Sequence, residues 1–207
     1  KKVKKNNLEI PKEWEIENFS DNKLSEIIKP NINLFNGKKS YLQTGDIDDD
    51  RLINFKNQIT FKKRESRANM QPIENSVWFA KMKNSKKPLY FGKYSLRRIN
   101  QIILSTGMMG LKIQENSLEY FWKTIRSNQF EKIKDLLSHG ATKQSVNNED
   151  LHFLPIIIPD QNTLNKFSAK TKNLFMKKYL NEENKNLSEI RDWILPMLLN
   201  KQVDFNK

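Results

Sequence analysis

The sequence predicts an α+β protein: a mixed-sheet domain, residues 1–158, followed by a long coiled-coil-forming α-helix within residues 159–207. Two patterns predict this division. Short strand-like runs alternate with polar turns up to Pro159, and apolar residues then recur at steps of three and four up to Leu198. The 12 Phe and 4 Trp beside 29% charged residues are typical of a folded chain, because disordered chains of that charge lack aromatic residues.

The first domain begins with a basic, polar lead-in, residues 1–11, which we expect to be flexible. It has no apolar stretch behind it, so it does not resemble a signal peptide. Runs rich in β-branched and aromatic residues then predict strands. These strands are expected at residues 41–44, 53–55, 58–61, 77–82 and 101–105.

Two helices are predicted between the last of these strands and the end of the domain. Apolar residues at helical spacing place them at residues 117–127 and 128–139. Ser117 is the expected N-cap of the first helix, and Gly140 stands where the second helix should stop.

The third zone, residues 160–201, has no Gly, and its only Pro is Pro196. About 40 helical residues would extend roughly 60 Å, so such a helix needs a partner for its apolar stripe. Polar residues interrupt the stripe at 178–186, and the alternatives are a helix folded back on its own domain or a hairpin broken near Asn184. The residues predicted to pair with another helix are Leu164, Phe167, Leu174, Leu187, Ile190 and Ile194.

The overall charge is strongly positive, with 37 Lys and Arg against 24 Asp and Glu, a net charge of +13. This excess indicates a polyanionic partner such as nucleic acid, while a generally Lys-rich proteome is the alternative. There are no cysteines, which excludes disulfides, thiolate catalysis and Cys-ligated zinc. The longest apolar run, residues 151–158, is far shorter than the roughly 20 residues that span a bilayer, so no membrane association is expected.

No catalytic or metal-binding pattern is found. His139 and His152 have no Cys or paired carboxylate at the spacing of metal ligands. The acidic run at 46–50 lacks the Gly and the final Glu of a calcium loop, and is interpreted as a solvated turn. We therefore expect no metal and no catalytic residue.

A small metal-dependent nuclease is the enzyme alternative. It would need Asp160 to meet Glu183 and Lys185 around one metal ion. Because Glu183 and Lys185 fall in the predicted long helix, this alternative is disfavoured.

Polar loops carry the nucleic-acid chemistry. Arg64 and Arg67 have the forked donors that read guanine or grip phosphate, and Asn69 and Gln71 can form paired bonds to adenine. A solvated loop tip is the alternative for each loop. Residues predicted to contact DNA come from loops 62–72, 81–87, 105–111 and 140–148. They are Arg64, Arg67, Asn69, Gln71, Lys81, Lys83, Asn84, Thr106, Lys143, Gln144, Ser145 and Asn147.

Several stretches, taken in order, resemble the DNA specificity subunits of type I restriction–modification systems. The similarity runs from about Pro11 to Val203. It is carried by residues 66–72, 77–83, 105–110, 140–146, 151–159 and 187–199.

The resemblance implies a target-recognition domain, 1–158, and a conserved helical spacer and dimerisation region, 159–207. In that family two such units usually share one subunit, each reads half of a bipartite site, and the paired helices dock methyltransferase subunits. This chain carries one unit, so it is either a half-subunit that must dimerise or a fragment of a longer protein.

The resemblance also implies partners and surroundings. The partners are double-stranded DNA, methyltransferase subunits and, through them, restriction subunits, with a second copy or second recognition unit on the helix. No cofactor is expected here, since S-adenosylmethionine and ATP would bind the partner subunits. The expected location is the prokaryotic cytoplasm, at the nucleoid. A protein-binding adaptor with non-specific DNA affinity, or the specificity module of a fused restriction–methylation enzyme, is the alternative. Neither the target sequence nor the methylated base is predicted.

Overall fold

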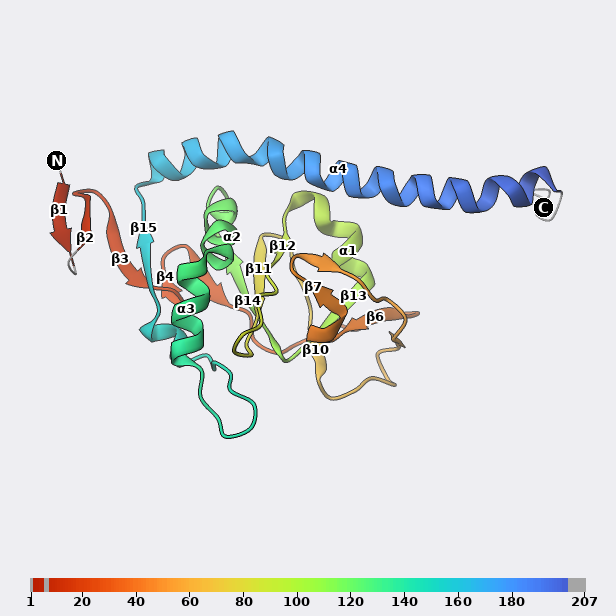
Figure 1. Ribbon diagram of the computed structural model, residues 1–207, viewed down its shortest axis with the longest axis horizontal. Coiled ribbons are helices and arrows are strands. Elements are labelled where there is room, and N and C mark those ends of the chain that lie inside the picture. The colour runs from red at the N-terminus through yellow and green to blue at the C-terminus, as the bar shows by residue number, and fades with distance from the viewer. Residues whose placement is uncertain (1, 6–7, 201–207) are drawn as a thin grey trace. The chain divides into compact units, whose positions relative to one another are not determined.

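The computed structural model describes the backbone of residues 2–5 and 8–200 (Figure 1). It describes their side chains except at 2–5, 8, 178–179, 182–183 and 185–186. The chain divides between Ser168 and Ala169 into two compact units. The first unit thus includes the first two turns of the long C-terminal helix, whereas the functional division at 158/159 stays a prediction.

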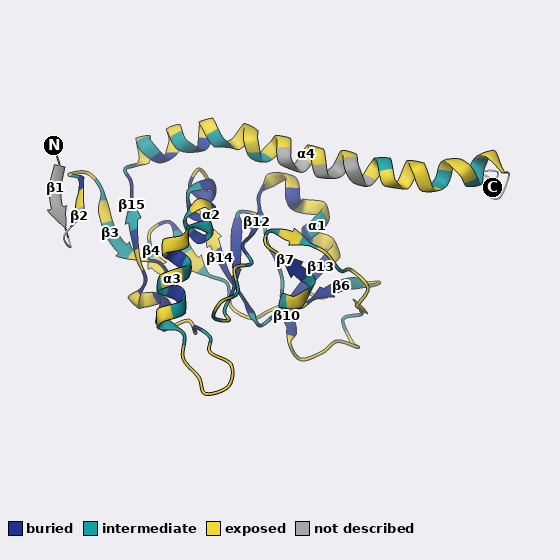
Figure 2. Ribbon diagram, in the orientation of Figure 1, coloured by how far each residue is buried: buried dark blue, intermediate teal, exposed yellow. Residues whose placement is uncertain are grey.

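A five-stranded antiparallel sheet forms the centre of the first unit. Its strand order is β12 (Leu89–Phe91), β11 (Ser76–Ala80), β14 (Met108–Ile113), β5 (Ser25–Ile27) and β4 (Asp21–Asn22). Every residue of β11 is buried, as Figure 2 shows, which explains the apolar run from Val77 to Ala80. Gly110 is required on β14, because a Cβ there would lie 2.6 Å from the ring of Trp78.

A second, four-stranded sheet lies beside the first. Its order is β10 (Ala68–Met70), β13 (Ile102–Ser105), β6 (Lys39–Leu42) and β9 (Gln58–Ile59). Strands β13 and β6 run parallel and the other pairs antiparallel, which confirms the predicted mixed sheet. The two sheets meet at the turn that joins β13 to β14, so this turn lies at the ends of strands from both.

Most of the predicted strands are present with shifted ends. The strands expected at 41–44, 58–61, 77–82 and 101–105 correspond to β6, β9, β11 and β13. The strand expected at 53–55 is wrong, because Ile53 and Phe55 lie in an exposed irregular segment after β8 (Arg51–Leu52). Within the lead-in, β1 (Lys2–Lys5) pairs with β2 (Leu8–Pro11), which the sequence analysis did not predict.

The two predicted helices are α2 (Leu118–Arg126) and α3 (Asn128–Leu137). They pack on the central sheet through Phe19, Phe79, Phe121 and Phe130, whose rings lie 5.0–6.3 Å apart. Ser117 is the N-cap residue of α2, as predicted, but its side chain makes no capping hydrogen bond. The helix α3, by contrast, has a side-chain cap at its N-terminus.

Ser127 caps α3 by accepting a 3.1 Å hydrogen bond from the amide of Phe130. The helix ends at Leu137, and Gly140 follows with a φ of +125°, where a Cβ would lie 2.8 Å from the carbonyl oxygen of Lys143. A glycine is therefore needed to turn the chain into the loop that follows α3.

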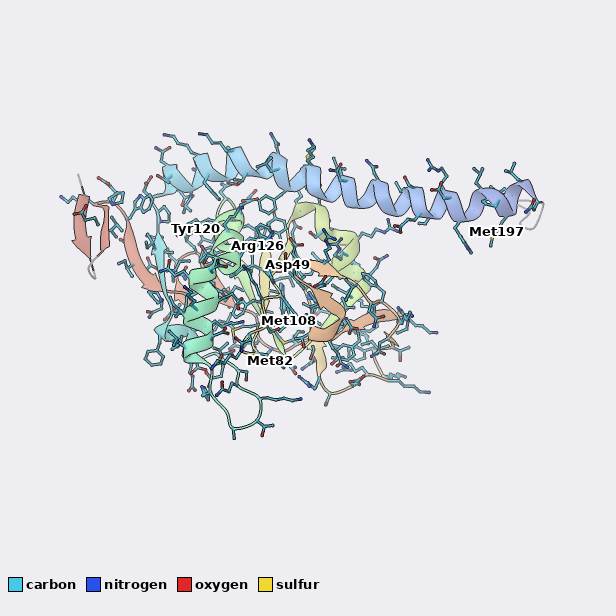
Figure 3. The ribbon with its side chains drawn as sticks, viewed as in Figure 1. Asp49, Met82, Met108, Tyr120, Arg126 and Met197 are labelled. Carbon is cyan, nitrogen blue, oxygen red and sulfur yellow. The ribbon has the colours of Figure 1, made fainter. Side chains whose placement is uncertain are left out.

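Shorter elements complete the first unit. The hairpin of β7 (Ile47–Asp48) and β8 is tied to α2, because Arg126 forms ion pairs with Asp49 at 3.2 Å and Asp50 at 3.1 Å (Figure 3). The acidic run is thus a structural anchor. Strand β3 (Glu15–Asn18) pairs with β15 (Pro155–Ile158). The remaining elements are α1 (Leu96–Gln101) and the 3-10 turns η1 (Thr44–Asp46), η2 (Lys93–Ser95) and η3 (Asp150–Phe153).

The long helix α4 extends over Gln161–Leu199 and is continuous through residues 178–186. This excludes the hairpin broken near Asn184. Asp160 caps the helix, accepting hydrogen bonds from the amide of Thr163 at 3.0 Å and from its hydroxyl. Of the part of the chain that the structure describes, no helix is both long and apolar enough to cross a membrane.

Two of the residues predicted to pair with another helix make contacts within the first unit. Leu164 is 1% exposed, and the ring of Phe167 lies 6.3 Å from that of Tyr120. The prediction for Leu164 is corrected, because its buried side chain anchors the first turn of α4 to its own unit. Phe167 is half-buried, so its pairing with another helix stays a prediction. Leu174, Leu187 and Ile190 are exposed and Ile194 is half-buried, so the coiled-coil pairing of this region stays a prediction.

Candidate nucleic-acid interface

A polar groove of about 630 Å³ lies where the ends of the two sheets meet the loop after α3. It gathers residues from five separate segments, including six of the residues predicted to contact DNA: Arg67, Lys81, Thr106, Lys143, Ser145 and Asn147. The other lining residues are Thr44, Met82, Gly107, Val146, Asn148 and Glu149. We call this feature the recognition groove.

The floor of the recognition groove is the turn between β13 and β14. The amide of Thr106 donates to the carbonyl of Arg67 at 2.9 Å, and the amide of Lys81 donates to the carbonyl of Gly107 at 3.0 Å. A Cβ on Gly107 would lie 3.3 Å from a guanidinium nitrogen of Arg67. The Arg67 side chain therefore lies directly over this glycine, with its backbone fixed by strand pairing.

One wall is built from two loops that pair with each other, the turn 81–85 and the loop 139–147. The amide of Val146 donates to the carbonyl of Lys81 at 3.0 Å, and the amide of Lys83 donates to the carbonyl of Gln144 at 2.9 Å. The loop closes on itself, because Ser145 and His139 exchange hydrogen bonds of 3.0 and 3.3 Å. A hydrogen-bonded framework thus positions the wall.

The tip of this wall is exposed over residues 140–144, as the yellow loop after α3 in Figure 2 shows. In Figure 1 the loop after α3 and the loop before β10 lie at the same edge of the first unit. The loops predicted to bind DNA therefore share one face, which the lining of the recognition groove also requires.

The charge of the recognition groove is positive, with the cations of Arg67, Lys81 and Lys143 against the carboxylate of Glu149. Burial lowers the pKa of Lys81 below its ordinary value of 10.5. A half-buried ammonium has lost part of its hydration shell, so an anion that replaces this water is favoured. Phosphate oxygens are anions of this kind.

Hydrogen-bonding side chains lie among these cations. Thr106 and Ser145 are half-buried and Asn147 is exposed, and each lines the recognition groove. The hydroxyl and amide groups can both donate and accept, as base edges require. The combination of cations and neutral donors matches nucleic acid better than a small anion.

Four of the other predicted residues lie outside the lining of the recognition groove: Arg64, Lys83, Asn84 and Gln144. Each makes hydrogen bonds within the protein with some, but not all, of its polar atoms. Arg64 is exposed, stacks on Phe61 at 4.5 Å and donates to the carbonyl of the same residue. Lys83 bonds the side-chain oxygen of Gln144 at 2.8 Å, at the outer side of the wall. Asn84 is an exposed residue with a φ of +56°, and its backbone amide donates to Asp135 at 3.0 Å.

Asn69 and Gln71 also lie outside the lining of the recognition groove. Asn69 is half-buried on β10. The side-chain amide of Gln71 donates to the carbonyls of Ile99 at 3.0 Å and Pro72 at 3.1 Å, and its oxygen accepts from Lys39 at 3.2 Å. The Gln71 amide is therefore engaged within the protein, contrary to the prediction that it is free for a base.

Thr44 and Glu149 line the groove but were not predicted from the sequence. Thr44 follows β6 and begins η1, and Glu149 precedes η3. Both reach the groove only through the pairing of strands and loops distant in the chain. No local pattern in the sequence marks them.

The nuclease alternative gains no support from the described residues. Asp160 accepts from the indole of Trp14 at 3.1 Å as well as from Thr163, and the Thr163 bonds hold the pKa of Asp160 below its ordinary value. The side chains of Glu183 and Lys185 lie outside the described residues. Within the described part of the chain, no group of three or more His, Cys, Asp or Glu side chains could hold a metal ion.

Comparison with known proteins identifies similar chains. No family model matches the sequence. The specificity subunit of the type I restriction enzyme HindI from Haemophilus influenzae is 34% identical over 91 residues, which are 43% of this chain and 20% of that protein. The chain thus spans a small part of this curated relative.

Two solved structures are similar over nearly the whole chain. One describes complex assembly and conformational transition of a type I R-M system, with a TM-score of 0.59 and 14% identity over 94% of this chain and 50% of that one. The other is the HsdS subunit from Thermoanaerobacter tengcongensis, with a TM-score of 0.56 and 16% identity over 95% of this chain and 50% of that one. The predicted resemblance to type I specificity subunits and the predicted α+β fold are confirmed.

Proposed function

We propose that this chain, which has the fold of type I specificity subunits and resembles one of them in sequence, is a DNA-sequence-reading unit of a type I restriction–modification complex. It recognises one half-site of a bipartite duplex and directs methyltransferase and restriction subunits to it. The observation that carries the proposal is the recognition groove, where cations and hydrogen-bonding groups from five segments lie together.

Each kind of side chain has a role in this proposal. Arg67 reads a base edge, since its guanidinium offers two parallel donors and its backbone is fixed at the groove floor. Lys81 and Lys143 neutralise phosphates, which contributes affinity without sequence information. Ser145 and Asn147 complete the hydrogen bonding to the bases or the backbone.

The chain is proposed to recognise DNA without modifying it. Methyl transfer and ATP-driven restriction would then belong to partner subunits that bind S-adenosylmethionine and ATP, in the prokaryotic cytoplasm where the nucleoid DNA lies. In support, the Asp160 carboxylate is occupied by the capping of α4 and the bond to Trp14.

A second recognition unit is proposed to pair with α4. From Ala169 onwards the helix exposes a series of large apolar side chains, which water solvates poorly. Those are Leu174, Met176, Leu180, Leu187, Ile190, Trp193, Leu195 and Leu199. A two-fold pairing of copies, or a second unit of a longer subunit, would cover them and set the distance between half-sites.

The proposal is tested by selecting duplexes from a randomised pool with the purified chain and measuring affinities by gel shift. We expect one recovered sequence motif. We also expect weaker binding of the motif after replacing Arg64, Arg67, Lys143 or Gln144 by Ala, with loss at Arg64 or Gln144 depending on sequence. Binding that follows salt but ignores sequence would support the adaptor instead. Affinities unchanged in all four variants would refute the loop assignment.

A further inference from the structure

Lys134 of α3 is a buried lysine behind the wall of the recognition groove. Its side chain is 0% exposed and is not part of the groove lining. The ammonium donates to the carbonyls of Ser85 at 3.0 Å, Met82 at 3.2 Å and Ala80 at 3.4 Å. It also forms an ion pair with Glu131, one turn earlier on the helix, at 2.8 Å.

A buried cation is strongly destabilising unless its donors are satisfied. Here the carbonyls and the Glu131 carboxylate satisfy them, and the carbonyl partners come from one short segment. That segment is the end of β11 and the turn 81–85. The position of the turn is therefore coupled to the position of the Lys134 ammonium.

The neighbouring residue on α3 strengthens this coupling. Asp135 accepts a 3.0 Å hydrogen bond from the amide of Asn84, and its carboxylate lies 3.8 Å from the Lys134 ammonium. The helix thus holds the turn through carbonyls on both sides of Asn84 and through the amide of Asn84 itself. Figure 3 labels Met82, whose carbonyl is one of the three, on this turn.

The turn 81–85 also holds the loop 139–147 through hydrogen bonds. Lys83 and Gln144 are joined by a backbone and a side-chain bond, and Val146 donates to Lys81. The side chains of Lys81, Lys143 and Ser145 that line the recognition groove therefore depend on one set of contacts. Lys134 lies at its centre.

We propose that Lys134 is a positioning residue for sequence readout, which rests on the proposed function of the recognition groove. Reading a base edge requires donors held within a fraction of an ångström, whereas attraction to phosphates tolerates displacement. Loss of the Lys134 ammonium thus weakens binding of the selected duplex more than binding of a scrambled one.

The test compares Lys134→Met with Lys132→Met. Both remove one positive charge from α3, but Lys132 is exposed. The variants are assayed in the full 207-residue chain with the duplex that the wild-type protein selects and with a scrambled duplex of equal composition. Hydrogen exchange of residues 81–85 and 143–146 is measured without DNA.

Lys134→Met is expected to weaken binding of the selected duplex about tenfold, since buried carbonyls lose a charged donor, and of the scrambled duplex about twofold or less. Amide exchange in both segments rises. Lys132→Met leaves the exchange unchanged and lowers both affinities by the same small factor. Equal losses on the two duplexes, or wild-type exchange in Lys134→Met, would overturn the proposal.

The proposed function of the groove and the proposed role of Lys134 can be refuted separately. If the wild-type chain selects no sequence, the proposed function fails, while the exchange rates still decide whether Lys134 holds the two loops. If Lys134→Met does not fold, NMR of the wild-type lysine ammonium groups decides. Slowly exchanging protons coupled to the carbonyls of Met82 and Ser85 are expected, and a rapidly exchanging Lys134 ammonium would contradict the proposal.

Discussion

The recognition groove and the part of α4 beyond Ser168 both present side chains to solvent, but of opposite chemistry. In the groove, polar and cationic side chains stand on backbone held by hydrogen bonds between distant segments. On α4, large apolar side chains such as Leu174 and Trp193, 67% and 64% exposed, stand on a helix that makes its own backbone bonds. The groove suits a polyanion, and the helix suits another apolar surface.

This difference predicts that the two surfaces can be damaged independently. Variants on α4 should abolish self-association and spare DNA binding by each unit, while groove variants should do the reverse. An α4 variant that weakens DNA binding, or a groove variant that weakens self-association, would show that the two surfaces are not independent.

The largest effect is expected for Leu187→Asp combined with Ile190→Asp. Burying each such side chain contributes about 1.5–3 kcal/mol, so a pair of copies that loses both should dissociate at least ~100-fold more readily. Sedimentation equilibrium measures this, with Asn184→Asp as a control that adds charge at an exposed polar position. A wild-type chain that stays monomeric at tens of micromolar would remove the self-pairing from the proposal.

The next effect is expected for Arg67→Ala. Loss of a paired contact to a base should weaken binding of the selected duplex by about 1–3 kcal/mol and relax the preference at one position. Repeated selection with the variant reveals that position. Arg51→Ala is the matched control, because Arg51 is an exposed arginine outside the groove lining. A similar loss in both variants would mean that charge alone is responsible.

A smaller and uniform effect is expected for Lys143→Ala. Loss of one phosphate contact should weaken all duplexes alike and reduce the slope of log affinity against log salt by about 0.9. Titrations at several salt concentrations measure the slope. If the slope stays unchanged while the sequence preference shifts, Lys143 reads bases.

The smallest effect is expected for Asp160→Asn, at the start of α4. Hydrogen bonds from Thr163 lower the pKa of Asp160 below its ordinary 3.8, so the charged form stabilises the folded state above that pH. The stabilisation is lost as the pH falls through the lowered pKa. The variant should therefore melt slightly below wild type at pH 7 and at the same temperature once the pH is below the lowered pKa. A difference that persists in acid would assign the effect to packing.

Some helices and strands of this fold could be predicted from the sequence, and others could not. The helices α2, α3 and α4 follow from local spacing of apolar residues, and β11 follows from a continuous apolar run. Ile53 and Phe55 also have large apolar side chains but form no strand, because no neighbouring strand pairs with them. Local pattern identifies an element only where tertiary pairing agrees with it.

The candidate site was predictable as a set of loops but not as a groove. Arg67, Lys81, Thr106 and Lys143 stand in polar segments that local composition marks, yet their meeting depends on the two sheets and on the loop pairing. The internal bonds of Gln71 and the burial of Leu164 depend on distant partners in the same way. Residue type alone does not distinguish a free side chain from an engaged one.

The most direct test of the recognition groove uses the absence of cysteine from the chain, which makes any introduced thiol unique. Ser145→Cys places a thiol in the groove, and Glu13→Cys places one at an exposed position outside its lining. Each variant is incubated with the selected duplex carrying a disulfide-activated thiol on one base. A protein–DNA cross-link is expected for Ser145→Cys and none for Glu13→Cys. Equal cross-linking of both, or cross-linking of Glu13→Cys alone, would contradict it.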